Sequence, residues 1–238
     1  MLLTTTTFSR LIPNHYTAFL EKLLRYIIVT LTVVFLVTLF LYLLYPTYVD
    51  HVEPTLADLG MLFRKGEAIY AWPATYSLHG LLYGPGLTEL QAAAQLLPVP
   101  LLISSKLPGV LPAAILALLF LRVTSSLIAR GYILFFFLFA DAALWNRADP
   151  ILGLAAFVSL LLTERKQMAH FLLFILLGVI AGICSSLKLH GALYIVPAFV
   201  MALSRQDKWL VPFALFVIFA AATLLASFAP PKLTFQIS

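Results

Sequence analysis

The sequence predicts an all-α integral membrane protein, and composition is the main reason. Of the 238 residues, 62% are hydrophobic and 11% are charged, and the mean hydropathy is +1.01. About a quarter of the residues in a soluble domain are charged, so this chain could not cover its surface in water. Elements that span lipid must be helices or a closed barrel. The run YIIVTLTVVFLVTLFLYLLY lacks the alternation of barrel strands, which favours helices.

Seven apolar segments follow one another along the chain, and we expect about seven transmembrane helices. The first has about 20 residues, the length that spans a bilayer. Several others are shorter and need flanking polar residues or a thinned bilayer. The segments are 26–45, 107–123, 131–144, 150–162, 169–186, 189–203 and 209–229.

The distribution of charge predicts a multi-pass protein of the cell membrane with a cytoplasmic N-terminus. Lys and Arg gather in the cytoplasmic loops of membrane proteins. In this orientation nine of the 15 basic residues are cytoplasmic, namely Arg10, Lys22, Arg25, Arg122, Arg130, Arg165, Lys166, Arg205 and Lys208. The external side then holds the acids Asp50, Glu53, Asp58, Glu67, Glu89 and Asp149. The first apolar run is longer than the core of a cleaved signal peptide, so we interpret it as a retained signal anchor.

Residues 46–105 separate the first two apolar segments, and we expect them to form an external loop of one transmembrane domain, 1–238. Within this loop, LTELQAAAQLLPVPLL is moderately apolar, yet Glu89, Gln91 and Gln95 interrupt it. We interpret it as a juxtamembrane helix on the external surface. The alternative is an eighth span over 87–103, which would place the basic segment RVTSSLIAR outside, against the charge rule.

Composition gives no support to nucleic-acid binding or to disulfide chemistry. The formal net charge is +5, which the cytoplasmic Lys and Arg explain, and no basic stripe is interleaved with aromatic residues. The single Cys184 excludes an internal disulfide and a cysteine-based metal cluster. A divalent cation held by loop acids with His51 or His79 is left open, although solvated loop histidines are commoner.

Acidic residues at two places are candidates for chemistry. Asp50 and Glu53 directly follow the first span, and Pro54, a common first residue of a helix, comes next. Asp149 lies between two apolar runs beside Arg147. Carboxylates of this kind suit general-base work on a hydroxyl group. The structural alternatives are a charged helix start and an interfacial Arg–Asp pair.

Cations and aromatic residues accompany these acids on the predicted external side. Lys106 and Lys188, like Arg147, suit a phosphate leaving group, and snorkelling to the interface is the alternative for both lysines. Tyr70, Tyr76 and Tyr83 belong to a Tyr-rich loop whose rings suit the flat faces of a sugar or an isoprenoid. An enzyme that joins a lipid-phosphate sugar to an acceptor needs a carboxylate base, cations for the phosphate and aromatic rings for the sugar or the lipid.

The order of these motifs resembles the polytopic glycosyltransferases of the GT-C superfamily. The resemblance rests on RKGEAIY, YSLHGLLYGPG, SSKLPGVLPAAILALLF, NRADPILGLAAFVSLLL and SLKLHGALYIVPA, in that order after a first span and an acid-bearing loop. It is strongest with the branch that groups dolichyl-phosphate-mannose-protein mannosyltransferases with Rgt-type lipopolysaccharide transferases. It covers the chain from about Tyr26 onwards, and each motif is weak on its own.

The resemblance implies an inverting sugar transfer from a polyprenyl-phosphate donor to a glycan, lipid or protein acceptor at the external face of a membrane, in bacteria the inner one. It implies that Glu53 or Asp50 acts as base or positions the acceptor, with Glu53 ranked first. It also implies matches for Arg147 and Asp149, and it places Lys188 near the donor phosphate.

Members of that superfamily are usually much longer, so the expectation is that this chain corresponds to their N-terminal module. The alternatives are a truncated or non-catalytic membrane protein with the same fold, or a small transporter. Transporters usually show inverted repeats and charges at mid-membrane, and neither is visible in the sequence.

Overall fold

The computed structural model describes residues 14–50, 52–66, 83–123, 147–165, 168–206 and 208–228, and these form an all-α fold. The all-α part of the predicted fold class is therefore confirmed. The described residues contain eight α-helices and one 3₁₀ helix. They are α1 (Asn14–Leu44), α2 (Val52–Arg64), α3 (Pro85–Ala94), α4 (Leu101–Val123), α6 (Asp149–Glu164), α7 (His170–Leu187), η2 (Gly191–Ile195), α8 (Val196–Leu203) and α9 (Leu210–Ser227).

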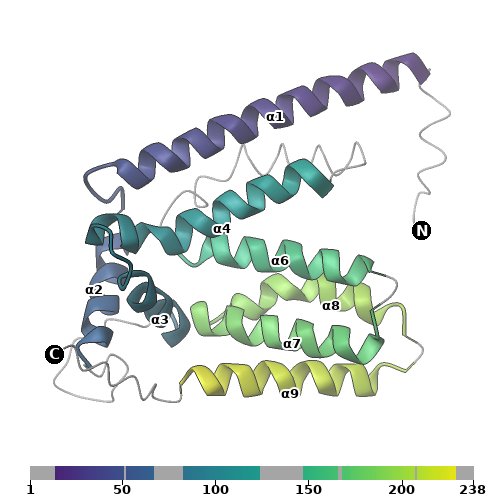
Figure 1. Cartoon of the computed structure of the whole chain (residues 1–238). Helices are drawn as coiled ribbons and strands as arrows, with labels where there is room; N and C mark the ends of the chain where they lie inside the picture. The colour runs from purple at the N-terminus through teal and green to yellow at the C-terminus, as the bar shows by residue number, and fades with distance from the viewer. Residues whose placement is uncertain are drawn as a thin grey trace.

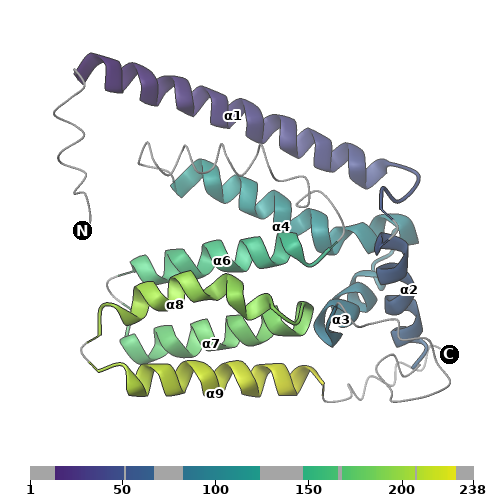
Figure 2. The same ribbon diagram turned by 180° about the vertical axis from the view of Figure 1, so that it is seen from behind.

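The long helices lie side by side in a row. Figure 1 shows α1, α4, α6, α7 and α9 stacked in this order, and Figure 2 shows α8 between α6 and α7 on the other side. The contacts agree, because α1 packs on α4, α4 on α6, α6 on both α7 and α8, and α7 on α9. The row is therefore built mostly from neighbours in sequence order.

Four of the described helices are long and apolar enough to cross a membrane. These spans are Ala18–Leu44, Leu101–Leu121, His170–Leu187 and Leu210–Ser227. They fit a multi-pass membrane protein, but the prediction of seven spans is wrong for the described part of the chain. The third predicted segment, 131–144, lies outside the described residues.

Two of the predicted spans are helices that are too short. The fourth segment forms α6, which has 16 residues and a length of about 24 Å at 1.5 Å per residue. The sixth segment begins with the 3₁₀ turn η2 and continues as α8, which has 8 residues. A bilayer core is about 30 Å thick, so apolar composition alone overstated the reach of both segments.

Helix α7 packs against α9 through two glycines spaced by four residues. A Cβ on Gly178 would lie 2.6 Å from the carbonyl oxygen of Phe216. A Cβ on Gly182 would lie 2.6 Å from the carbonyl oxygen of Ala220 and the same distance from Cβ of Thr223. This is the small-xxx-small pattern that lets helix backbones approach closely in membranes.

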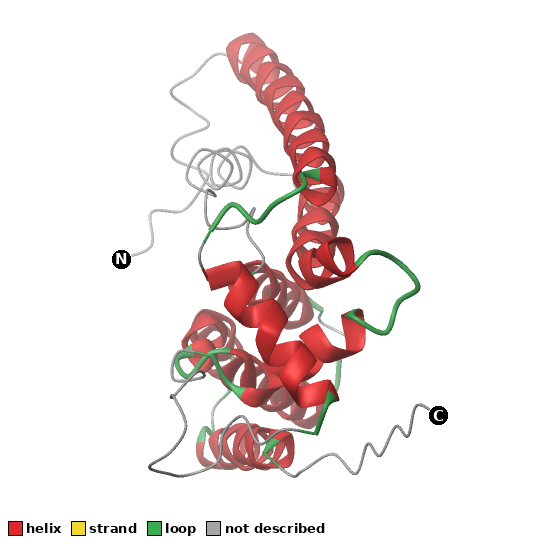
Figure 3. Cartoon of the chain, turned by 90° about the vertical axis from the view of Figure 1, so that its left-hand side faces the viewer, coloured by secondary structure: helices red, strands yellow, loops and turns green. Residues whose placement is uncertain are grey.

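The segment predicted to be an external loop contains two described helices that lie across one end of the row (Figure 3). α2 and α3 pack on each other, and their buried residues Leu56, Leu59 and Leu87 join the core formed with α6, α7 and α8. α3 has 10 residues, which fits the surface-helix interpretation and not an eighth span. The same end of the row holds the C-terminal end of α1 and the first turns of α4 and α6 (Figure 1).

Charged residues lie at both ends of the row. The end opposite α2 and α3 holds Arg165 and Arg205, and there Arg205 donates a hydrogen bond to the carbonyl oxygen of Thr163. Gln206 and His170 are hydrogen-bonded at this end as well. The acids Asp50, Glu53 and Asp149 lie at the α2–α3 end. Which end faces the cytoplasm stays a prediction.

Candidate functional site

Two neighbouring ion pairs lie at the α2–α3 end of the bundle. Arg147 pairs with Asp50, and Nζ of Lys188 lies 2.9 Å from Oδ1 of Asp149. Arg147 and Asp149 are two residues apart, so the pairs adjoin each other. We call these four residues the ion-pair cluster. It joins three segments that are distant in sequence: the loop after α1, the start of α6 and the end of α7.

The ends of two helices place the cluster. Asp149 lies in the first turn of α6 and Pro150 follows it at a position that suits proline. A carboxylate at a helix N-terminus is stabilised by the helix dipole. Lys188 is the C-cap residue of α7, and its backbone N–H donates to the carbonyl oxygen of Cys184. A cation at a helix C-terminus is favourable for the same reason, so each partner of the pair suits its helix end.

Tyr83 lies beside this cluster because its backbone pairs with that of Lys188. The two residues form an isolated antiparallel bridge, and the N–H of Gly84 donates to the carbonyl oxygen of Leu187 at 3.1 Å. A Cβ on Gly84 would collide with the carbonyl group of Ser186, so only glycine allows this approach. Burial, and to a smaller extent the charge of Asp149, raise the pKa of the Tyr83 phenol.

Glu53 lies in the first turn of α2, as the sequence suggested, but its side chain is 0% exposed. Oε1 accepts a hydrogen bond from the hydroxyl group of Tyr42 at 2.7 Å. Oε2 accepts a hydrogen bond from the backbone N–H of Val49 at 3.1 Å. These contacts direct the carboxylate toward the end of α1 and the loop that follows it.

Lys106 is also 0% exposed, although it lies in the apolar helix α4. Its ammonium group donates to the carbonyl oxygens of Tyr42, Tyr45 and Thr47 at 3.0, 2.8 and 2.9 Å. An ammonium group has three N–H donors, and each has a carbonyl partner. The ammonium nitrogen also lies 4.7 Å from the centre of the Tyr42 ring, a distance that suits a cation–π contact.

The structure therefore sorts the predicted site residues into two groups. Asp50, Arg147, Asp149 and Lys188 meet in the ion-pair cluster, with Tyr83 beside them. Glu53 and Lys106 belong to a second group, buried around Tyr42. Tyr70 and Tyr76, like His51 and His79, lie outside the described residues.

Tyr42 is a site residue that sequence reasoning missed. It is 8% exposed, and it contacts Glu53 through its hydroxyl group and Lys106 through both its carbonyl oxygen and its ring. The available signal was its place in YLLYPTY, where three tyrosines follow a mostly apolar run. A tyrosine at a membrane interface usually suggests an anchor, so this pattern did not distinguish an anchor from a buried hydrogen-bond donor.

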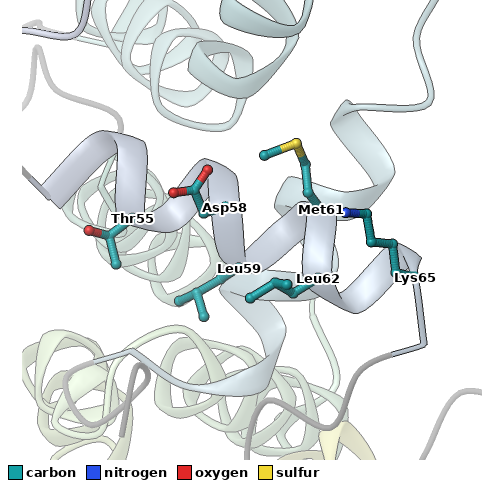
Figure 4. Close-up of a pocket in the computed structure, with 6 residues that line it drawn as sticks. All are labelled: Thr55, Asp58, Leu59, Met61, Leu62 and Lys65. Atoms are coloured by element: carbon teal, nitrogen blue, oxygen red, sulfur yellow. The ribbon is translucent and has the colours of Figure 1, made fainter. Parts of the chain in front are cut away.

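A surface hollow of about 490 Å³ lies on α2, away from both groups. Figure 4 shows its lining, which consists of Thr55, Asp58, Leu59, Met61, Leu62 and Lys65. No member of the ion-pair cluster lines it. Within the described ranges, no group of three or more His, Cys, Asp or Glu side chains could hold a metal ion.

Comparisons of the chain with protein-family models, with curated proteins and with solved structures find no match.

Proposed function

We propose that this protein is a membrane glycosyltransferase that moves a sugar from a polyprenyl-phosphate donor to an acceptor hydroxyl group at the external face of the membrane. The observation that supports the proposal is the ion-pair cluster, which places two carboxylates and two cations together at one end of an apolar bundle.

The two cations of the cluster are assigned to the donor phosphate. Sugar transfer breaks the bond between the anomeric carbon and the phosphate oxygen, and the lipid phosphate leaves with the electron pair. Arg147 offers a planar fork of donors that matches phosphate, and Lys188 offers a compact point charge. Their side chains are 23% and 20% exposed, so both are accessible from the surface of the bundle.

The two carboxylates are assigned to the acceptor. A base takes the proton from the acceptor hydroxyl group as its oxygen forms the new bond to the anomeric carbon. Asp149 is 21% exposed and Asp50 is 8% exposed. Glu53 is 0% exposed and its oxygens face protein donors. Asp149 therefore ranks first as the base, ahead of Asp50, and Glu53 takes a supporting role.

Tyr83 is proposed to contact the sugar or the isoprenoid tail, because it is half-buried and its phenol lies within the electrostatic influence of Asp149. Tyr70 and Tyr76 belong to the same proposal on their sequence pattern alone. Lys106 is left out of the phosphate site, since its three donors already bind carbonyl groups.

The test is sugar transfer by the full chain in lipid nanodiscs, with radiolabelled polyprenyl-phosphate sugars as donors. Asp149→Asn is expected to lower kcat/KM by a factor of about 10²–10⁴, the contribution of a positioned acid–base group. Lys188→Met is expected to lower it by about 10²–10³, the contribution of one preorganised donor to a developing negative charge. Lys208→Met is the matched control, because Lys208 is exposed at the opposite end. Equal rates in the parent and both cluster variants would contradict the assignment.

A second candidate is a non-catalytic membrane protein in which the cluster fastens helices together. The observation that favours it is the pairing itself, since each carboxylate of the cluster already has a cationic partner. In that case Lys188→Met lowers the thermal midpoint while the parent protein neither transfers sugar nor binds polyprenyl phosphate. Binding of polyprenyl phosphate that Lys188→Met weakens, with the midpoint unchanged, would exclude this candidate.

A further inference from the structure

The loop that carries Asp50 begins where α1 ends, and Lys106 holds that end. The last carbonyl groups of a helix have no partners within the helix. Lys106 reaches from α4 and donates to Tyr42, inside the last turn, and to Tyr45 and Thr47, beyond it. A single ammonium group therefore fixes the backbone over six residues, from the last turn of α1 into the loop.

The buried charge of Lys106 is balanced by Glu53. Burying an ammonium group is costly unless a partner compensates it. The carboxylate of Glu53 acts on it electrostatically, and Tyr42 stands between them, with its ring against the ammonium group and its hydroxyl group on the carboxylate. Both charged side chains are 0% exposed, so water does little to screen them from each other.

Glu53 holds the same loop from its other side. Its Oε2 accepts from the N–H of Val49, the residue before Asp50. A third tie links the hydroxyl groups of Tyr48 and Ser105 at 2.9 Å, and Ser105 adjoins Lys106 in α4. The loop is thus fixed at consecutive positions up to the residue that enters the ion-pair cluster.

We infer that Lys106, Tyr42 and Glu53 are positioning residues, a buried charge pair with a tyrosine between its members, which holds the 45–50 loop so that Asp50 meets Arg147. The part of this inference that concerns the reaction rests on the proposed function. The part that concerns the loop does not, because it follows from the hydrogen bonds and the burial of the two charges.

The experiment compares Lys106→Met, Glu53→Gln and the double variant, with Lys208→Met as the control. Loop order is read by electron paramagnetic resonance from a spin label at Val49→Cys in a Cys184→Ala background, because Val49 is 56% exposed and Cys184 is the single cysteine. Thermal midpoints are measured on the same samples. Tyr42→Phe, which keeps the ring and both charges, is a milder variant if a charge variant does not fold.

Each single charge variant is expected to mobilise the label and to lower the midpoint by about 10 °C, since it leaves a buried charge unpaired. The double variant is expected to lose less than the two single losses combined, because it removes both charges. Tyr42→Phe is expected to mobilise the label with a smaller fall in midpoint. The inference is overturned if the two single losses in thermal midpoint add up in the double variant. It is also overturned if the mobility of the label is unchanged in Lys106→Met and Tyr42→Phe.

Enzyme activity is a further measurement, and it would not change if these residues only stabilised the fold. If Asp50 is misplaced, kcat of Glu53→Gln falls about 100-fold, the usual cost of a displacement of about 1 Å. Lys106→Met, which leaves the Glu53 carboxylate in place, is expected to lower kcat by a similar factor, because it frees the same loop. A parent-like kcat in Lys106→Met beside a slow Glu53→Gln would make Glu53 a reacting group and overturn the positioning role. If the parent protein transfers no sugar, the proposed function fails, while the label and the midpoints still decide the inference on the loop.

Discussion

At the scale of single residues, the polar side chains of this chain differ most in what surrounds them. Lys106 and Lys188 looked alike in the sequence, because each lysine closely follows a pair of serines at the edge of an apolar run. In the structure Lys106 caps a helix from inside the bundle, while Lys188 pairs with a partly exposed carboxylate. Residue type predicted that both would need partners, but only three-dimensional contacts show that the partners are backbone carbonyls in one case and Asp149 in the other.

Glu89 illustrates the cost of burying part of a carboxyl group. Burial raises its pKa above the ordinary value of 4.5, because the charged form loses solvation. The folded protein therefore binds this proton more tightly than the unfolded chain does. The contribution of Glu89 to stability is full below pH 4.5 and is lost as pH rises through the folded pKa.

We expect Glu89→Gln to raise the thermal midpoint by a few degrees at pH 7 and to have little effect near pH 4. The neutral amide removes the cost of the buried charge at pH 7, whereas at low pH the carboxyl group is already neutral. The measurement is the midpoint of both proteins across this pH range. Glu164→Gln is the matched control, because Glu164 is exposed at the end of α6. If the difference in thermal midpoint between Glu89→Gln and the parent stayed constant with pH, the raised pKa of Glu89 would be contradicted.

At the scale of helices, apolar composition predicted the existence of the elements better than their boundaries. The expected start of the second span was residue 107, but α4 begins at Leu101. The predicted apolar segment stops short of Lys106, since a charge is costly within a membrane helix. Lys106 lies within α4 since α1 supplies carbonyl partners. Pro108 and Pro112 are also inside α4, and membrane helices tolerate them more readily than soluble ones do.

The contact of α7 with α9 gives a prediction about packing. Gly182→Ala is expected to lower the thermal midpoint, with a loss of about 1–3 kcal/mol, the usual cost of overpacking, because its new Cβ would lie 2.6 Å from the carbonyl oxygen of Ala220. Gly153→Ala is the matched control, since the nearest atom to that Cβ would be Cδ2 of Leu116 at 3.5 Å, an ordinary contact. Equal midpoints in the two variants would show that α7 and α9 do not approach as closely as described.

At the scale of the whole molecule, the separation of Arg165 and Arg205 from the acids Asp50 and Asp149 agrees with the sequence, the number of spans does not, and the orientation stays a prediction. Basic Arg165 and Arg205 lie at one end of the row, and acidic Asp50 and Asp149 lie at the other. Charge follows the two faces of a membrane and is readable from sequence order. Span number depends on helix length. In the run 189–203, Gly191 begins the turn η2 and Pro197 lies in the first turn of the short α8, a break that apolar composition alone does not register. The convergence of the ion-pair cluster is a property of packing between distant segments, which a single sequence does not record.

The predicted orientation can be tested with single cysteines in the Cys184→Ala background. Val49→Cys and Trp209→Cys lie at opposite ends of the row, and the parent side chains are 56% and 55% exposed. With a cytoplasmic N-terminus, an impermeant maleimide added to intact cells is expected to label position 49. Position 209 should be labelled only after the membrane is permeabilised. The reverse labelling pattern would place the N-terminus on the external side. Labelling of both positions from outside would show that the two ends do not face opposite sides of the membrane.

The attachment of α9 has a practical consequence. Only 6% of its span is buried, and it meets α7 at Gly178 and Gly182 through close fit, a force that does not depend on expelling water. Lipid tails are as apolar as the helix, so they neither drive this contact nor compete strongly with it. The detergent or lipid used for extraction therefore decides whether α9 stays packed on α7 in the purified protein. Lipid nanodiscs are expected to preserve this contact.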